Sequence, residues 1–241
     1  MARRSSTTSR TLAPDPAERV PPGPDAVVSS VRLIGTDGST AAILVGRTRV
    51  ARVDAMEIRR LGIESGTRWT AELAGRVHDA ARAHAAYRHA LRLIGAGQRS
   101  REDLKQRLVR AGHRESDASA AVDRLVEAGL VDDQAMAERL AEHLASGSRL
   151  GRRGIEYKLR RKGLSSALSR EVSARALEHA DTAEMAAELA RKRIGRMAGL
   201  ESHVIQRRLF GFLIRRGFSV DDARRAVESA MDELARDEEL H

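Results

Sequence analysis

One helical motif occurs three times in this chain. The segments 103–113 (DLKQRLVRAGH), 154–164 (GIEYKLRRKGL) and 208–218 (RLFGFLIRRGF) align without a gap. Each carries two apolar residues four positions apart, an arginine two positions after the second, and a glycine two positions later. The apolar pairs are Leu104/Leu108, Ile155/Leu159 and Leu209/Leu213, the arginines are Arg110, Arg161 and Arg215, and the glycines are Gly112, Gly163 and Gly217.

This spacing restricts what the chain can fold into. Residues four apart lie on one face of a helix, and a glycine after the last turn ends a helix at little cost in the left-handed conformation. The glycines are 51 and 54 residues apart. Repeats of this length are typical of stacked helical units that offer one extended surface to a partner. We therefore expect a mostly α fold built from tandem helical repeats.

The whole chain divides into five segments. Residues 1–26 contain all five prolines and several arginines, which predicts a disordered tail. Residues 27–83 form an N-terminal extension, with β-prone runs that predict a hairpin or three-stranded sheet up to about Val53, followed by helix. Repeats of three helices each are predicted at 84–131, 132–180 and 181–241, the last with an acidic C-terminal end. Helix starts are indicated by Ser100 with Asp103, Asp181 with Glu184, and Ser219 with Asp222.

No catalytic constellation is present in the sequence. There is no phosphate-binding loop of the Walker type and no HExxH pair, and zero cysteines exclude disulfides, thiolate metal sites and cysteine nucleophiles. His84 and His89 are five residues apart and so lie on different helical faces. Asp132 and Asp133 follow a turn and are better explained as a helix start than as paired catalytic carboxylates. We expect no enzyme activity, no cofactor and no metal.

Composition limits the location of the protein. No run approaches the roughly 20 apolar residues of a membrane-spanning helix, and the N-terminus lacks the apolar core of a secretory signal. These features predict a cytoplasmic protein without a membrane partner. We also expect the protein to be a monomer.

Basic charge is concentrated in the second and third repeats. The formal net charge is +9. Residues 148–164 hold seven basic side chains and one acidic one, and residues 191–217 hold eight basic side chains and one acidic one, whereas residues 220–241 hold eight acids and three arginines. This distribution favours a polyanion or an acidic protein surface as partner.

Helical geometry selects the candidate contact residues. With Ile155 set at 0° and a step of about 100° per residue, Arg160 falls at about 140°, Arg153 at about 160°, Tyr157 at about 200° and Arg161 at about 240°, all away from the apolar edge. Arginines in a last helical turn also stabilise the helix dipole, which explains Arg110 equally well. The predicted partner-binding residues are Arg153, Tyr157, Lys158, Arg160, Arg161, Arg208, Arg215 and Arg216.

Several motifs occur together in the order found in a known family. The region from Ala86 to about Met231 contains, in order, the motifs SREDLKQRLVRAG, AAVDRLVEAGLVDD, GRRGIEYKLRRKGL and LFGFLIRRGFSVDDARRAVE. This region closely resembles the bacterial RecX family. The resemblance implies three tandem three-helix repeats in an elongated, curved array. It also implies a non-enzymatic regulator that binds the RecA filament on DNA and mainly inhibits ATP hydrolysis, filament growth and strand exchange in recombination, DNA repair and the SOS response.

Two other functions remain open from the residues alone. In the interpretation that the resemblance implies, the protein could also contact the DNA within the filament. A basic helical protein could instead bind nucleic acid by itself, or it could be a scaffold for another acidic protein. Only six aromatic residues occur in the chain, so an aromatic base-stacking platform has little support. The RecA filament is the predicted partner, and a stand-alone nucleic-acid-binding protein is the alternative.

Overall fold

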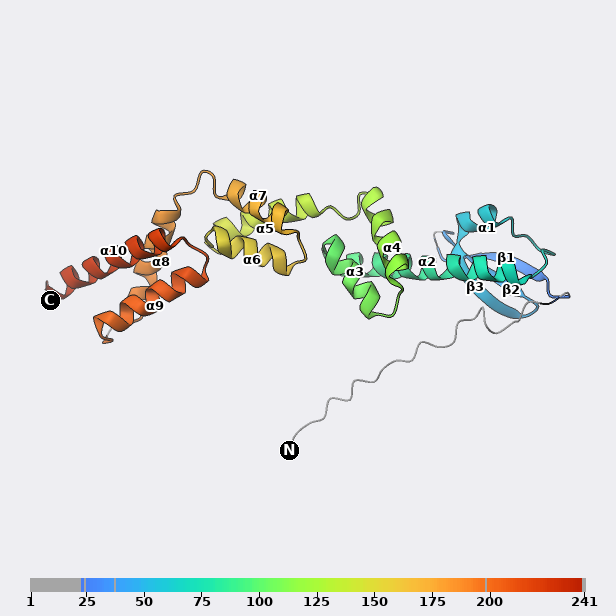
Figure 1. The fold of residues 1–241 in the computed structure, drawn as a ribbon, viewed down its shortest axis with the longest axis horizontal. Coiled ribbons are helices and arrows are strands. Elements are labelled where there is room, and N and C mark those ends of the chain that lie inside the picture. The colour runs from blue at the N-terminus through green and yellow to red at the C-terminus, as the bar shows by residue number, and fades with distance from the viewer. Residues whose placement is uncertain (1–22, 24, 37, 198, 240–241) are drawn as a thin grey trace, which may run out of the picture. The chain divides into compact units, whose positions relative to one another are not determined.

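A computed structural model describes residues 23, 25–36, 38–197 and 199–239. Its described part divides into two compact units. Figure 1 labels the helices and strands of both. The first unit comprises the described residues up to Arg92 together with Arg107–Arg124, and the second comprises Leu93–Gln106 together with the described residues from Leu125 onward. The predicted disordered tail lies, apart from its last few residues, outside the described part of the chain.

The first unit contains a three-stranded sheet, which is one of the two forms predicted for this segment. Strands β1 (Val28–Ile34), β2 (Thr40–Val45) and β3 (Thr48–Asp54) pair antiparallel in the order β1-β2-β3. Ile43 in the central strand pairs with Val31 on one side and Ala51 on the other. Ile43 and Trp69 are fully buried in the same apolar cluster, so the sheet packs onto the chain that follows it, as the sequence predicts.

Two helices follow the sheet. Asp54 caps α1 (Ala55–Leu61) by accepting a hydrogen bond from the backbone N–H of Met56 at 3.0 Å. Helix α2 (Ala71–Gly95) is 25 residues long, and its N-terminal part contributes Leu73 and Val77 to the sheet cluster. The predicted boundary between residues 83 and 84 falls inside α2, because no helix-breaking residue interrupts the sequence there. One helix therefore serves both the N-terminal extension and the first repeat.

The first repeat is completed by α3 (Arg101–Arg110) and α4 (Glu115–Glu127). Helix α4 is held to α2 by an ion pair between Arg82 and Asp117 at 3.5 Å. The guanidinium of Arg124 also lies 4.1 Å from the centre of the Tyr87 ring. Near the start of α4, His113 Nε2 lies 3.1 Å from His89 Nδ1 on α2.

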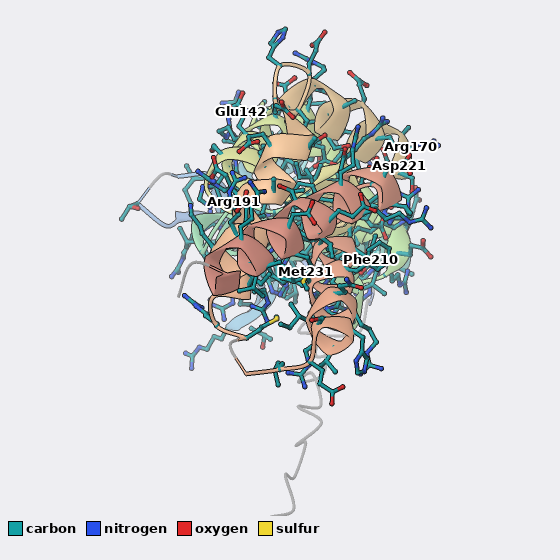
Figure 2. The ribbon with its side chains drawn as sticks, turned by 90° about the vertical axis from the view of Figure 1, so that its left-hand side faces the viewer. Glu142, Arg170, Arg191, Phe210, Asp221 and Met231 are labelled. Carbon is teal, nitrogen blue, oxygen red and sulfur yellow. The ribbon has the colours of Figure 1, made fainter. Side chains whose placement is uncertain are left out.

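The second and third repeats belong to the second unit. The second repeat contains α5 (Asp133–Ser146), α6 (Arg152–Arg161) and α7 (Ser166–Ala176), and the third contains α8 (Thr182–Ile194), α9 (Ser202–Arg215) and α10 (Val220–Glu239). Figure 2 looks onto the third repeat and shows Phe210 and Met231 where α9 and α10 meet. The predicted helix starts are confirmed, since Ser100, Asp181 and Ser219 each accept a backbone hydrogen bond from the residue three positions ahead. Asp132 caps α5 in the same way, by accepting from Ala135.

The repeated motif has the same structural role in α3, α6 and α9. All six residues of its apolar pairs are fully buried. Its glycines have positive φ angles of 94° at Gly112, 85° at Gly163 and 88° at Gly217, which is the conformation predicted for a helix end. The mostly α architecture of three-helix repeats after a small sheet is thus confirmed.

Candidate basic interface on the second and third repeats

The middle helices of successive repeats meet end to end. The C-terminal turn of α9 lies on the N-terminus of α6, where the N–H of Gly151 donates to the carbonyl of Arg216 at 3.1 Å. The N–H of Arg153 donates to the carbonyl of Gly217 at 3.2 Å. Gly151 precedes α6 and has no side chain to cap it, so the α9 carbonyls satisfy backbone donors that would otherwise lack partners. The opposite ends of the two helix dipoles also face each other there.

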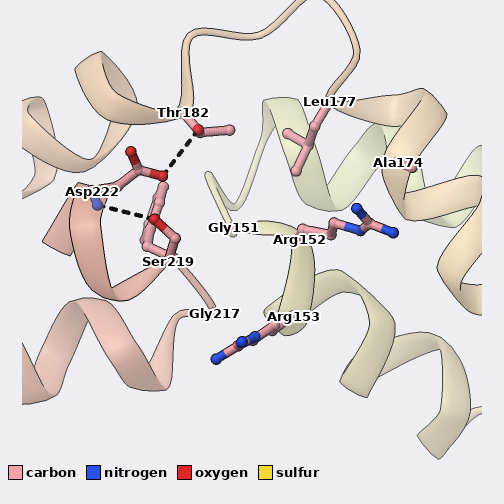
Figure 3. Close-up of a pocket in the computed structure, with 10 residues that line it drawn as sticks. Gly151, Arg152, Arg153, Ala174, Leu177, Thr182, Gly217, Ser219 and Asp222 are labelled. Atoms are coloured by element: carbon pink, nitrogen blue, oxygen red, sulfur yellow. Dashed lines mark hydrogen bonds between the residues drawn. The ribbon is translucent and has the colours of Figure 1, made fainter.

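Glycine is required at this joint because the two backbones touch. A Cβ atom on Gly217 would lie 1.8 Å from the nitrogen of Gly154, and one on Gly154 would lie 2.2 Å from the carbonyl oxygen of Arg216. Figure 3 shows Gly151 and Gly217 beside each other, with the side chains of Arg152 and Arg153 extending in different directions. The joint thus fixes α6 against α9 while the side chains of Arg152 and Arg153 stay exposed.

The same arrangement recurs one repeat earlier. The hydroxyl of Ser100, at the start of α3, donates to the carbonyl of Lys162, at the end of α6, at 2.6 Å. A Cβ atom on Gly163 would lie 2.5 Å from the Ser100 oxygen. Gly163 and Gly217 occupy the same position in the repeated motif. Gly163 and Gly217 therefore each allow the end of their helix to lie against the middle helix of the preceding repeat.

The α6 face predicted from the sequence is at the surface. Arg153, Tyr157, Lys158, Arg160 and Arg161 are all exposed, and Tyr157 keeps 53% of its accessible area. The guanidinium of Arg161 lies 5.8 Å from the centre of the Tyr157 ring, close enough for a weak cation–π contact.

Nothing on α6 neutralises this face. The helix has one acidic residue, Glu156, which is paired with Arg152 at 3.2 Å. Within the described part of the chain, no ion pair involves the four cationic side chains of the predicted face. We refer to Arg153, Tyr157, Lys158, Arg160 and Arg161 as the α6 basic face.

The predicted arginines of the third repeat lie in two different surroundings. Arg208 and Arg215 are exposed and line an open pocket of about 670 Å³. Arg216 is partly buried, and its guanidinium donates to the carbonyl of Ser148 at 2.7 Å and lies 5.0 Å from the centre of the Phe212 ring. Arg216 thus links α9 to the segment before α6.

The pocket contains three arginines that were not selected from the sequence. It lies between the C-terminal end of α8 and α9, and its lining residues are Arg193, Arg196, Met197, Arg207, Arg208 and Arg215. All of these arginines belong to the basic run 191–217, so the charge signal was present in the sequence. Periodicity within a single helix could not show that residues from two helices converge. We refer to these six residues as the arginine pocket.

Comparisons with known proteins identify the family. Residues 132–172 match the model of the second three-helix domain of RecX, and residues 180–227 match that of the third. A regulatory protein RecX of Amycolatopsis mediterranei is 32% identical over 151 residues, which cover 61% of this chain and 84% of the relative. The chain belongs to the RecX family. A regulatory protein RecX of Streptomyces coelicolor is 33% identical over 149 residues, covering 62% of this chain and 79% of the relative.

Solved RecX structures share the fold. A crystal structure of regulatory protein RecX superposes with a TM-score of 0.69 at 20% identity and covers 86% of this chain and 99% of its own. RecX from Lactobacillus salivarius gives a TM-score of 0.53 at 21% identity over 62% of this chain and 96% of its own. A regulatory role follows from the RecX family. In the described residues, no helix is long and apolar enough to cross a bilayer, and no group of three or more potential metal ligands occurs.

Proposed function

We propose that this chain is a non-enzymatic, monomeric, cytoplasmic regulator that binds along the RecA filament on DNA and restrains RecA ATP hydrolysis, filament growth and strand exchange. Membership of the RecX family supports the regulatory role. The observation that carries the proposal is the pair of basic surfaces on adjacent repeats, the α6 basic face and the arginine pocket, fixed by one backbone joint.

The joint matters because a filament presents repeating sites. When one of two weak binding surfaces on a rigid protein is bound, the other is held near its own site at an effective concentration set by the spacing of the two surfaces. The overall affinity then exceeds that of either surface alone. The Gly151–Arg216 and Arg153–Gly217 hydrogen bonds restrict the spacing of the two basic surfaces. Two basic surfaces held at a restricted spacing are better matched to the repeating sites of neighbouring filament protomers than to a single compact partner.

The charge of the two surfaces specifies the kind of partner. Their cationic side chains have no acidic partner within the described residues, so binding an acidic surface does not require breaking internal ion pairs. Such a surface speeds association and raises specificity more than it raises affinity. The partner is therefore expected to present carboxylates, phosphates, or both, as a recombinase on DNA would.

A titration distinguishes the proposal from the stand-alone DNA-binding alternative. Increasing amounts of the protein are added to RecA, single-stranded DNA and ATP, and phosphate release is measured. Binding to the same DNA without RecA is measured by fluorescence anisotropy in the same buffer. We expect hydrolysis to be suppressed at concentrations where little free DNA is bound. Suppression that only follows the occupancy of free DNA would support the alternative instead.

A further inference from the structure

The arginine pocket is a concentrated cluster of like charge. Five of its six lining residues are arginines, and no acidic residue lines it. None of these five arginines forms an ion pair with another described residue. Neighbouring arginines elsewhere in the third repeat differ in this respect, since Arg191 is paired with Glu233 at 3.7 Å and Arg225 with Asp222 at 2.8 Å. Like charges at this density repel one another, and a bound anion would relieve that repulsion.

Gly211 places one of these arginines. It lies in the middle of α9, where glycine is less favourable than alanine because it loses more backbone conformational entropy on folding. A Cβ atom at this position would lie 3.1 Å from Nη1 of Arg215 and 3.9 Å from its Cζ, and these atoms all belong to the end of one flexible side chain. Gly211 therefore leaves room for the Arg215 guanidinium to lie against the helix backbone.

Phe212 places a second arginine. The guanidinium of Arg193, on α8, lies 4.4 Å from the centre of the Phe212 ring. Phe212 is itself partly buried against the core of the third repeat. Arg193 is thus held by a contact that leaves its hydrogen-bond donors available, and a pre-organised guanidinium loses less conformational entropy on binding.

The geometry favours phosphate over carboxylate as the bound group. A guanidinium binds two oxygens side by side, and a carboxylate has only two oxygens to offer. A phosphate offers more acceptor oxygens and can be shared by several guanidiniums from different directions. The lining contains no aromatic ring on which a base could stack, which indicates recognition of the phosphate without its base.

We propose that the arginine pocket is a phosphate-binding site. The phosphate can come from a polynucleotide backbone or from a free polyphosphate. The site requires no recombinase, so it can exist whether or not the chain modulates a filament.

Binding of two probes to the full chain tests the site. The probes are a fluorescein-labelled oligothymidylate, followed by anisotropy at several salt concentrations, and inorganic pyrophosphate, followed by calorimetry. The pocket variant is Arg208→Gln/Arg215→Gln. The matched control, Arg139→Gln/Arg224→Gln, removes the same charge from exposed arginines outside the pocket. We expect the pocket variant to weaken binding of at least one probe about tenfold, and the control to weaken it less than about twofold.

The two probes identify the source of the phosphate. If the pocket variant loses oligonucleotide binding, and the slope of log affinity against log salt concentration is smaller by about 1 than for the wild type, the phosphate comes from a polynucleotide backbone. Loss of pyrophosphate binding alone identifies a free polyphosphate. If the pocket variant binds both probes as the control does, the phosphate site is wrong. The phosphate site would also be wrong if such a variant had lost its effect on a RecA filament, because the pocket would then be contacting protein.

A glycine pair tests the placement of Arg215 without removing charge. Gly211→Ala is expected to raise the melting temperature by about 1–4 °C through helix propensity, while weakening phosphate binding roughly threefold because Arg215 must move. Gly75→Ala, on α2, has no atom within 4 Å of the added Cβ and should raise the melting temperature without affecting binding. Unchanged binding in Gly211→Ala would overturn the role assigned to Gly211.

Discussion

The backbone N–H of Arg153 donates a hydrogen bond to the carbonyl of Gly217 at 3.2 Å, which joins the first turn of α6 to the last turn of α9. Gly217 ends one copy of the repeated motif, and Arg153 immediately precedes the other. The residue that stops a helix within its own repeat therefore also starts a helix in the repeat before it. This double role explains why the motif glycine is buried at Gly217 but exposed at Gly112, the corresponding glycine of the first repeat.

Gly217→Ala should destabilise the protein by more than about 2 kcal/mol. The positive φ of 88° costs about 1–2 kcal/mol for alanine, and the added Cβ would overlap the backbone of Gly154. Gly129→Ala is the control, because Gly129 also has a positive φ but no atom within 4 Å of the added Cβ. Urea denaturation followed by circular dichroism measures both. If both variants lost the same free energy of unfolding, the overlap with the backbone of Gly154 would add nothing to the cost of Gly217→Ala.

Adjacent arginines at the end of α9 should behave differently. Arg216→Ala leaves the carbonyl of Ser148 without its guanidinium donor, so the free energy of unfolding should fall by about 1–3 kcal/mol. Arg215→Ala removes an exposed side chain and should change stability by less than about 0.5 kcal/mol. The same denaturation experiment compares the two variants. A larger loss for Arg215→Ala would contradict the roles assigned to them.

The sequence predicted the helical framework more completely than the interface. Burial of the Leu104/Leu108 pair and its equivalents follows from spacing within one helix, as do the caps at Asp132 and Asp181. The hydroxyl of Ser100 was predicted to cap its own helix. Its bond to the carbonyl of Lys162 joins residues 62 positions apart, which no local pattern encodes.

The candidate site shows the same limit. Exposure of the α6 basic face could be predicted because one helical period determines which side is apolar. The difference between Arg215 and Arg216 depends on where Ser148 and Phe212 lie in the folded chain. The arginine pocket depends on two helices meeting, so its charge was visible in the sequence while its shape was not.

The histidine pair of the first unit should make stability depend on pH. Burial, and then the positive charge of Arg92, lower the pKa of His89, and burial, followed by the charge of His89, lowers the pKa of His113. In the folded state, protonation is therefore disfavoured relative to the unfolded chain, whose histidines titrate near 6.5. The stability that the folded state has when both histidines are neutral is fully present above pH 6.5. It is lost as the pH falls through the folded-state pKa values of His89 and His113.

Melting temperatures at pH 7.5 and pH 5.5 test this expectation. The wild type should lose stability on acidification, and His89→Gln/His113→Gln should lose less. His143→Gln/His179→Gln is the matched control, because both of these histidines are exposed. The idea fails if the double variant of the pair and the control show the same pH dependence.

The most direct test of the proposed interface is the inhibition of RecA ATP hydrolysis by a variant of the α6 basic face. Lys158→Gln/Arg160→Gln/Arg161→Gln removes three exposed cations, and Arg139→Gln/Arg170→Gln/Arg224→Gln removes three exposed cations from α5, α7 and α10. With folding checked by circular dichroism, the α6 variant should need at least about tenfold more protein for half-maximal inhibition, and the control less than about threefold more. Equal inhibition by the α6 variant and the wild type would contradict the assignment of this face to the partner.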